Sequence, residues 1–79
     1  MTAQQQNART PMHPLIRRLL HACRQRDIHW DQMSEAAQRM MNKAVDACYK
    51  DAMNAGLMRE ARQAVDSWRD VAKELGVAQ

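Results

Sequence analysis

The apolar residues of segment 33–55 cover more of a helical surface than one neighbouring helix can bury. At about 100° per residue they fall within an arc of roughly 160°, and charged residues gather on the opposite side. The residues on this arc are Met33, Ala37, Met40, Met41, Ala44, Val45, Ala47, Cys48 and Ala52. We therefore expect residues 33–55 to form a central helix whose apolar arc is covered by two other elements.

Two further segments have the apolar spacing of amphipathic helices. The first spans about 11–25, with Thr10 as N-cap and Pro11 as first helical residue; a start at His13 followed by Pro14 is the alternative. Its apolar residues are Met12, Leu15, Ile16, Leu19, Leu20 and Cys23. The last helix spans about 57–75, with apolar residues Met58, Ala61, Ala64, Val65, Trp68, Val71, Ala72 and Leu75, and closes at Gly76. The pattern predicts an all-α fold, a small three-helix bundle in which the first and third helices cover the second.

The remaining segments are expected to be connections or an arm. Residues 1–10 are polar and lack periodicity, which indicates a flexible N-terminal arm before a single domain over 11–79. Residues 26–31 interrupt the helical period and are expected to form a loop whose Ile28 and Trp30 turn inward. Either Asp31 or Ser34 caps the second helix, which ends near Gly56.

Basic charge is concentrated in the first third of the chain. Residues 1–26 contain five arginines and no acid, whereas residues 27–79 contain seven basic and nine acidic residues. The first part therefore carries +5 and the second −2, which together give the net charge of +3. Any attraction to phosphate or to an acidic partner is expected to reside in the first third.

The sequence contains no motif typical of catalysis or metal binding. It lacks a Gly-rich phosphate loop and a nucleophile motif, and His13 and His21 do not form an i, i+4 ligand pair. Cys23 and Cys48 are isolated and lie on apolar arcs, as expected of small buried hydrophobic residues in a reducing compartment. We expect no enzyme activity, no cofactor and no metal. No segment has the length of a membrane span, so a cytoplasmic protein without membrane contact is expected.

Seven residues are candidates for partner binding. Four of them form a basic face on the first helix: Arg17, Arg18, His21 and Arg24. Trp30 and Tyr49 become anchors if they are exposed, since aromatic residues are enriched in binding hot spots. Asp51 projects from the apolar arc of the second helix. Either the helix has emerged from the core there, or the carboxylate pairs with Arg59 or Arg62, or it contacts a partner.

These features favour a small non-enzymatic regulator or inhibitor that binds another protein, of the kind carried by phages and other mobile elements. It would act by occluding or bridging a larger complex, such as one that processes nucleic acid. A homodimer through the apolar surface left over on the first and second helices is expected, because three short Ala-rich helices offer a thin core. The alternative is a small nucleic-acid-binding protein, dimeric, that uses the basic face of the first helix.

Overall fold

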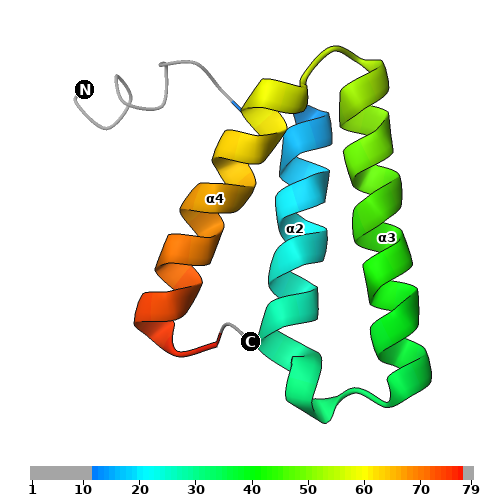
Figure 1. The fold of residues 1–79 in the computed structure, drawn as a ribbon, viewed down its shortest axis with the longest axis vertical. Coiled ribbons are helices and arrows are strands. Elements are labelled where there is room, and N and C mark those ends of the chain that lie inside the picture. The colour runs from blue at the N-terminus through cyan, green and yellow to red at the C-terminus, as the bar shows by residue number, and fades with distance from the viewer. Residues whose placement is uncertain (1–11, 78–79) are drawn as a thin grey trace, which may run out of the picture.

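The computed structural model describes residues 12–77, which form three α-helices and one short 3₁₀ helix (Figure 1). In chain order these elements are α2 (Pro14–His29), η1 (Trp30–Gln32), α3 (Glu35–Asn54) and α4 (Met58–Leu75). The prediction of an all-α three-helix bundle is confirmed. The predicted N-terminal arm, residues 1–10, lies outside the described residues.

The first helix begins and ends later than its main prediction placed it. His13 is the N-cap, with its Nδ1 accepting a hydrogen bond of 3.1 Å from the Leu15 amide, and Pro14 follows as the first helical residue. The alternative start is thus confirmed, and the end at residue 25 is wrong. Nothing breaks the helix before His29, because residues 15–29 contain neither Gly nor Pro.

The predicted loop over residues 26–31 is therefore wrong. Residues 26–29 continue α2, and residues 30–32 form η1. Ile28 does not turn inward but is 47% exposed. It lies nine residues, or two and a half turns, after the buried Leu19 and therefore on the opposite side of α2. Trp30 is half-buried.

The Ser34 cap and the two closing glycines predicted for the other two helices are confirmed, but α3 begins at Glu35 and not at residue 33. Ser34 rather than Asp31 caps α3, with its Oγ accepting a hydrogen bond of 3.1 Å from the Ala37 amide. Gly56 and Gly76 follow α3 and α4 with φ of 78° and 76°, the left-handed conformation in which glycine avoids the steric cost of a Cβ.

The central helix of the structure is α2, and the prediction that residues 33–55 occupy the centre is wrong. Figure 1 shows α2 between α4 and α3, and it contacts both of them more extensively than they contact each other. The molecule is correspondingly flat, with extents of 45 × 31 × 16 Å. The helix with the largest buried aliphatic side chains occupies the centre, because those side chains need cover from two neighbours.

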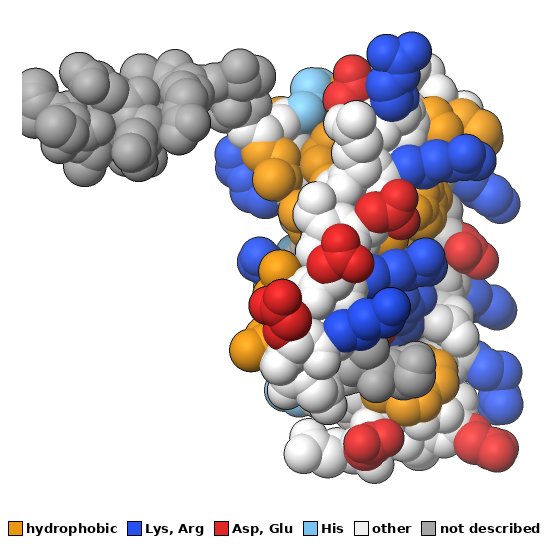
Figure 2. Space-filling model, turned by 60° about the vertical axis from the view of Figure 1, so that its left-hand side comes forward, with side chains coloured by type: hydrophobic (Ala, Val, Ile, Leu, Met, Phe, Trp, Pro, Cys, Tyr) orange, Lys and Arg blue, Asp and Glu red, His pale blue; other side chains and the backbone are white. Residues whose placement is uncertain are grey.

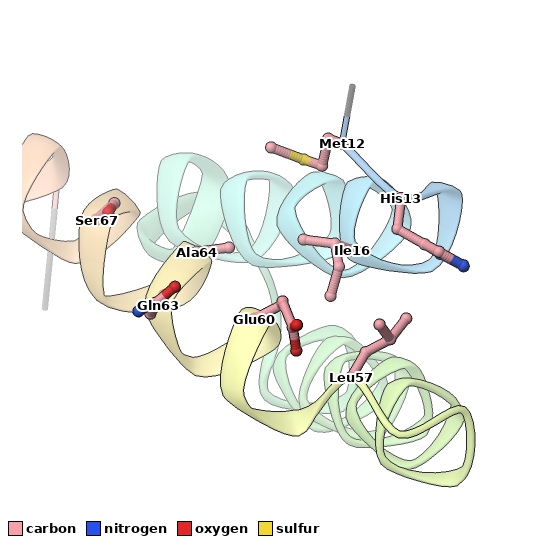
Figure 3. Close-up of a pocket in the computed structure, with 8 residues that line it drawn as sticks. All are labelled: Met12, His13, Ile16, Leu57, Glu60, Gln63, Ala64 and Ser67. Carbon is pink, nitrogen blue, oxygen red and sulfur yellow. The ribbon is translucent and has the colours of Figure 1, made fainter. Parts of the chain in front are cut away.

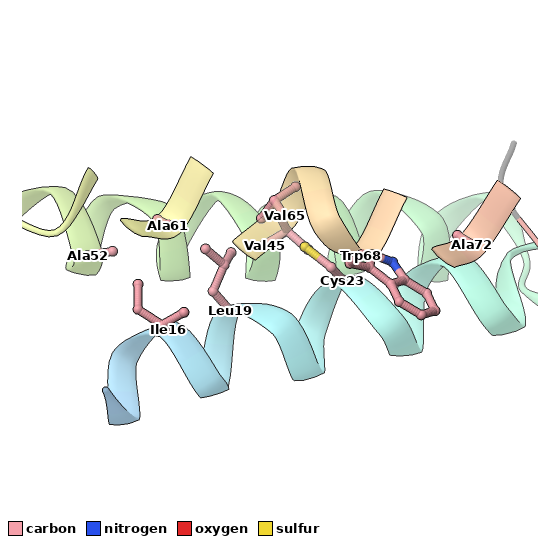
Figure 4. Close-up of a cluster of buried hydrophobic side chains, with 9 residues drawn as sticks. All are labelled: Ile16, Leu19, Cys23, Val45, Ala52, Ala61, Val65, Trp68 and Ala72. Carbon is pink, nitrogen blue, oxygen red and sulfur yellow. The ribbon is translucent and has the colours of Figure 1, made fainter. Parts of the chain in front are cut away.

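The core is built mainly from small side chains (Figure 4). Only two buried residues come from α3, whereas four come from α4. The core residues are Ile16, Leu19, Cys23, Val45, Ala52, Ala61, Val65, Trp68 and Ala72. Because alanine side chains bury little area, Leu19 and Trp68 supply a large share of the apolar surface removed from water.

A polar contact at one end of the core joins α2 to α4. Trp68 Nε1 donates a hydrogen bond of 2.8 Å to Asp27 Oδ2, and Arg26 Nε donates one of 3.0 Å to Asp27 Oδ1. The guanidinium of Arg24 lies 5.5 Å from the centre of the Trp68 ring, within the range of a cation–π contact. The side chain of Asp27 is only 10% exposed, so its two hydrogen bonds offset the cost of removing the carboxylate from water.

We expect replacement of Asp27 by alanine to lower the free energy of unfolding by about 2 kcal/mol, because the Trp68 donor loses a charged acceptor. Asp27→Asn is the matched control, since its side-chain oxygen can still accept from Trp68. It should lose less than half as much. Urea unfolding would show both effects as midpoint shifts at constant m-value. Equal losses in the two variants would contradict this account of the contact.

Candidate interaction surfaces

The four predicted basic residues lie together on α2. Arg17, Arg18, His21 and Arg24 are all exposed, and we call them the basic face. One of them is held locally, since Arg17 Nη2 donates a hydrogen bond of 3.3 Å to the Met12 carbonyl. The only acid on this helix, Asp27, is turned inward, so no exposed carboxylate on α2 neutralises the basic face.

The apolar arc of α3 is covered on one side only. Met40 is 69% exposed, and Ala44 and Ala47 are exposed as well. With Asp51, these residues follow the i, i+4, i+7, i+11 spacing of one helical face, and we call them the outer edge of α3. The two covering surfaces that the sequence predicted are therefore not both present within the described residues.

Asp51 is exposed on this outer edge. The ion pair to Arg59 or Arg62 that was one of its predicted explanations does not form, since the only ion pair among residues 12–77 joins Arg26 to Asp27. The end of α3 has not left the core, since the adjacent Ala52 is fully buried, but Asp51 itself lies on the side of α3 that faces away from the core.

The two predicted aromatic anchors are half-buried and lie apart from the basic face along the chain. Trp30 is held in η1, where its carbonyl accepts a hydrogen bond of 3.0 Å from Gln38 Nε2. Tyr49 lines a hollow of about 360 Å³ between α3 and α4, together with Met53 and Met58. Partial burial raises the pKa of the Tyr49 hydroxyl. Because both rings are half-buried, their exposure does not assign either of them to a binding surface.

A groove that the sequence did not predict lies between α2 and α4. Two hollows of about 430 and 270 Å³ adjoin here and share Met12, Ala64 and Ser67 as lining residues. Figure 3 shows the residues that line the larger one. The signal in the sequence is the width of the apolar stripe on α4, which includes Val71 and Leu75 beyond the residues that the core buries. They are 46% and 64% exposed.

The titratable groups of residues 12–77 do not form a metal site. No group of three or more His, Cys, Asp or Glu side chains in this part of the chain could hold an ion. Cys23 is buried and Cys48 half-buried, and both are free thiols. Burial raises the pKa of the Cys23 thiol, because the apolar surroundings disfavour the thiolate.

Comparisons with known proteins give no family for this chain. No protein-family model, curated protein or solved structure matches it. None of the helices in the described part of the chain is long and apolar enough to cross a membrane. The surfaces available for function are therefore the basic face, the outer edge of α3 and the groove.

We expect the two thiols to react at different rates with a water-soluble disulfide reagent at neutral pH. Cys48 should react in the folded protein, whereas Cys23 should react only as fast as the protein opens, because the thiolate is the reactive species and burial opposes it. Absorbance of the released thiol measures both phases, and Cys48→Ser should abolish the fast phase alone. Loss of the slow phase instead would contradict the burial of Cys23.

Proposed function

We propose that this chain is a small non-enzymatic protein-binding regulator that occludes or bridges a larger complex, as an inhibitor of the phage or mobile-element type would. The observation that carries the proposal is the outer edge of α3. Its apolar residues extend over about two turns in the middle of a well-formed helix, and the described part of the chain leaves them in water. An apolar helical face of this kind is a common docking element in protein recognition.

The chemistry of the outer edge supports a protein partner. Met40 is flexible and polarisable, so it can adapt to the shape of a partner's surface. Ala44 and Ala47 have no side chain beyond Cβ, so a partner's side chains can approach the α3 backbone closely. Asp51 at the end of the row supplies a charge that would fix the orientation of the partner.

The basic face would contribute differently from the outer edge. Exposed charges change the rate of encounter more than they change the lifetime of a complex. Four basic side chains without an exposed acid on the same helix would steer the protein towards an acidic target, and the outer edge of α3 would supply affinity.

A capture experiment tests this proposal by comparing variants. The tagged protein is incubated with a nuclease-treated bacterial lysate, and the retained proteins are identified by mass spectrometry. We expect the wild type to retain a defined protein that Ala44→Glu loses, because a carboxylate in the centre of the apolar row would have to be buried unpaired.

Asn42→Glu is the matched control on the same helix. It introduces the same charge at an exposed position away from the outer edge, and a carboxylate there can still accept from Arg26, whose Nη1 lies 3.5 Å from Asn42 Oδ1. It should retain the captured protein. Equal capture by the wild type and Ala44→Glu would contradict the proposal.

A second candidate function is nucleic-acid binding, and the basic face specifically favours it. Lys and Arg side chains bind phosphate by releasing counterions from nucleic acid, which makes the affinity steeply dependent on salt. Three arginines with one histidine form a small footprint, so modest affinity is expected from a monomer.

We expect a variant with Arg17, Arg18 and Arg24 replaced by glutamate to distinguish the two functions. If nucleic acid is the ligand, fluorescence anisotropy with labelled DNA and RNA should show binding that this variant abolishes and that about 200 mM salt weakens strongly. If a protein is the ligand, the same variant should chiefly slow association. Binding of nucleic acid by the triple variant with wild-type affinity would exclude the basic face as its site.

A further inference from the structure

The α2–α4 groove has an apolar floor that the described chain leaves open. Met12 is 44% exposed at one end and Val71 is 46% exposed towards the other, with the half-buried Leu20 and Ala64 between them. In Figure 3, Leu57 and Ile16 close the end of the groove nearest the α3–α4 turn. Covering an apolar surface of this kind with a complementary one is favourable, because it removes apolar side chains from water.

The two walls of this groove carry opposite charge. On α2, Arg17 and Arg24 are seven residues apart and therefore lie on the same side, and Arg24 lines the groove. On α4, Glu60 lines the groove, and Glu74 lies seven residues beyond the lining residue Ser67. Figure 2 shows a diagonal row of acidic side chains on the α4 side with hydrophobic side chains beside it.

We propose that the groove binds a second copy of this chain, so that α2 and α4 of one copy pack against α4 and α2 of the other. The face is self-complementary: an isologous interface requires one face to carry both members of every contact, and this face carries a basic wall, an apolar floor and an acidic wall. Binding a partner of a different sequence would not require this one face to carry both a basic and an acidic wall.

Charge selects one of the two face-to-face arrangements with two-fold symmetry. A two-fold axis across the helices would stack α2 on α2 and α4 on α4, and like charges would meet. An axis along the helices stacks α2 on the partner's α4. Since α2 and α4 run in the same direction, the basic side of α2 then faces the acidic side of α4 in the other copy (Figure 1).

The size of this face predicts a weak dimer. At 1.5 Å per residue, the 18 residues of α4 span about 27 Å, and two adjacent helices are about 20 Å wide. Each copy would therefore cover roughly 500 Å², which places the dimer at the weak end of specific interfaces. Both monomer and dimer should be populated at micromolar concentrations. Added salt should favour the monomer, because the charged side chains lie at the rim.

The test is sedimentation equilibrium of the wild type and two charge-reversed variants, Arg17→Glu/Arg24→Glu and Glu60→Lys/Glu74→Lys. The wild type should self-associate, and each variant should weaken dimerisation by about tenfold or more. An equimolar mixture of the two variants should recover association, because opposite charges meet again in the heterodimer. This recovery also shows that the variants are folded.

Two outcomes would overturn the proposal: a wild type that stays monomeric up to millimolar concentration, or variants whose mixture does not associate. Ala44→Glu on the outer edge of α3 is the matched control, and it should dimerise like the wild type. A dimer that this variant disrupts would place the interface on α3 instead. The inference does not depend on the proposed protein target, whose capture is tested by that same variant.

Discussion

The hydrogen bond from Trp68 to Asp27 holds α4 against α2, and the arrangement of the three helices depends on it. The other buried residues of α4 are a valine and two alanines, which bury little area on their own. Trp68 is the one large buried side chain of that helix, and Asp27 fixes its ring by accepting from Nε1. Arg26 pairs with the same carboxylate and also reaches Asn42 on α3, so one small polar cluster contacts all three helices.

A core with so few large side chains explains why the molecule is open. Three helices close into a compact bundle when each has a broad apolar stripe with bulky residues to bury. Here α3 contributes only Val45 and Ala52 to the core, and α4 leaves Val71 and Leu75 outside it. The helices consequently lie side by side around α2. The outer edge of α3 and the α2–α4 groove stay open because so few bulky side chains are available to pack.

Much of the fold could be predicted because it depends on local chemistry. The left-handed conformation of Gly56 and Gly76 and the cap at Ser34 depend only on neighbouring backbone groups, so the local sequence predicts them. The exposure of the basic face follows in the same way from helical periodicity. The position of α2 at the centre could not be predicted from the angular width of the apolar arc on α3. That width counts an alanine like a leucine, although alanine buries much less area. The depth of Trp30 and Tyr49 and the existence of the groove depend on how helices pack, which periodicity alone does not determine.

The outer edge of α3 is open to water, while the opposite side of the helix packs on α2. Relaxation of the methionine methyl groups by a soluble paramagnetic probe tests it most directly, because the effect falls steeply with distance from solvent. At low protein concentration, we expect the methyl of Met40 to relax fastest among those of α3 and its two flanking turns, and those of the half-buried Met33, Met41 and Met58 to relax more slowly. A Met40 methyl as protected as that of Met41 would show that another surface covers this edge, and the account would be wrong.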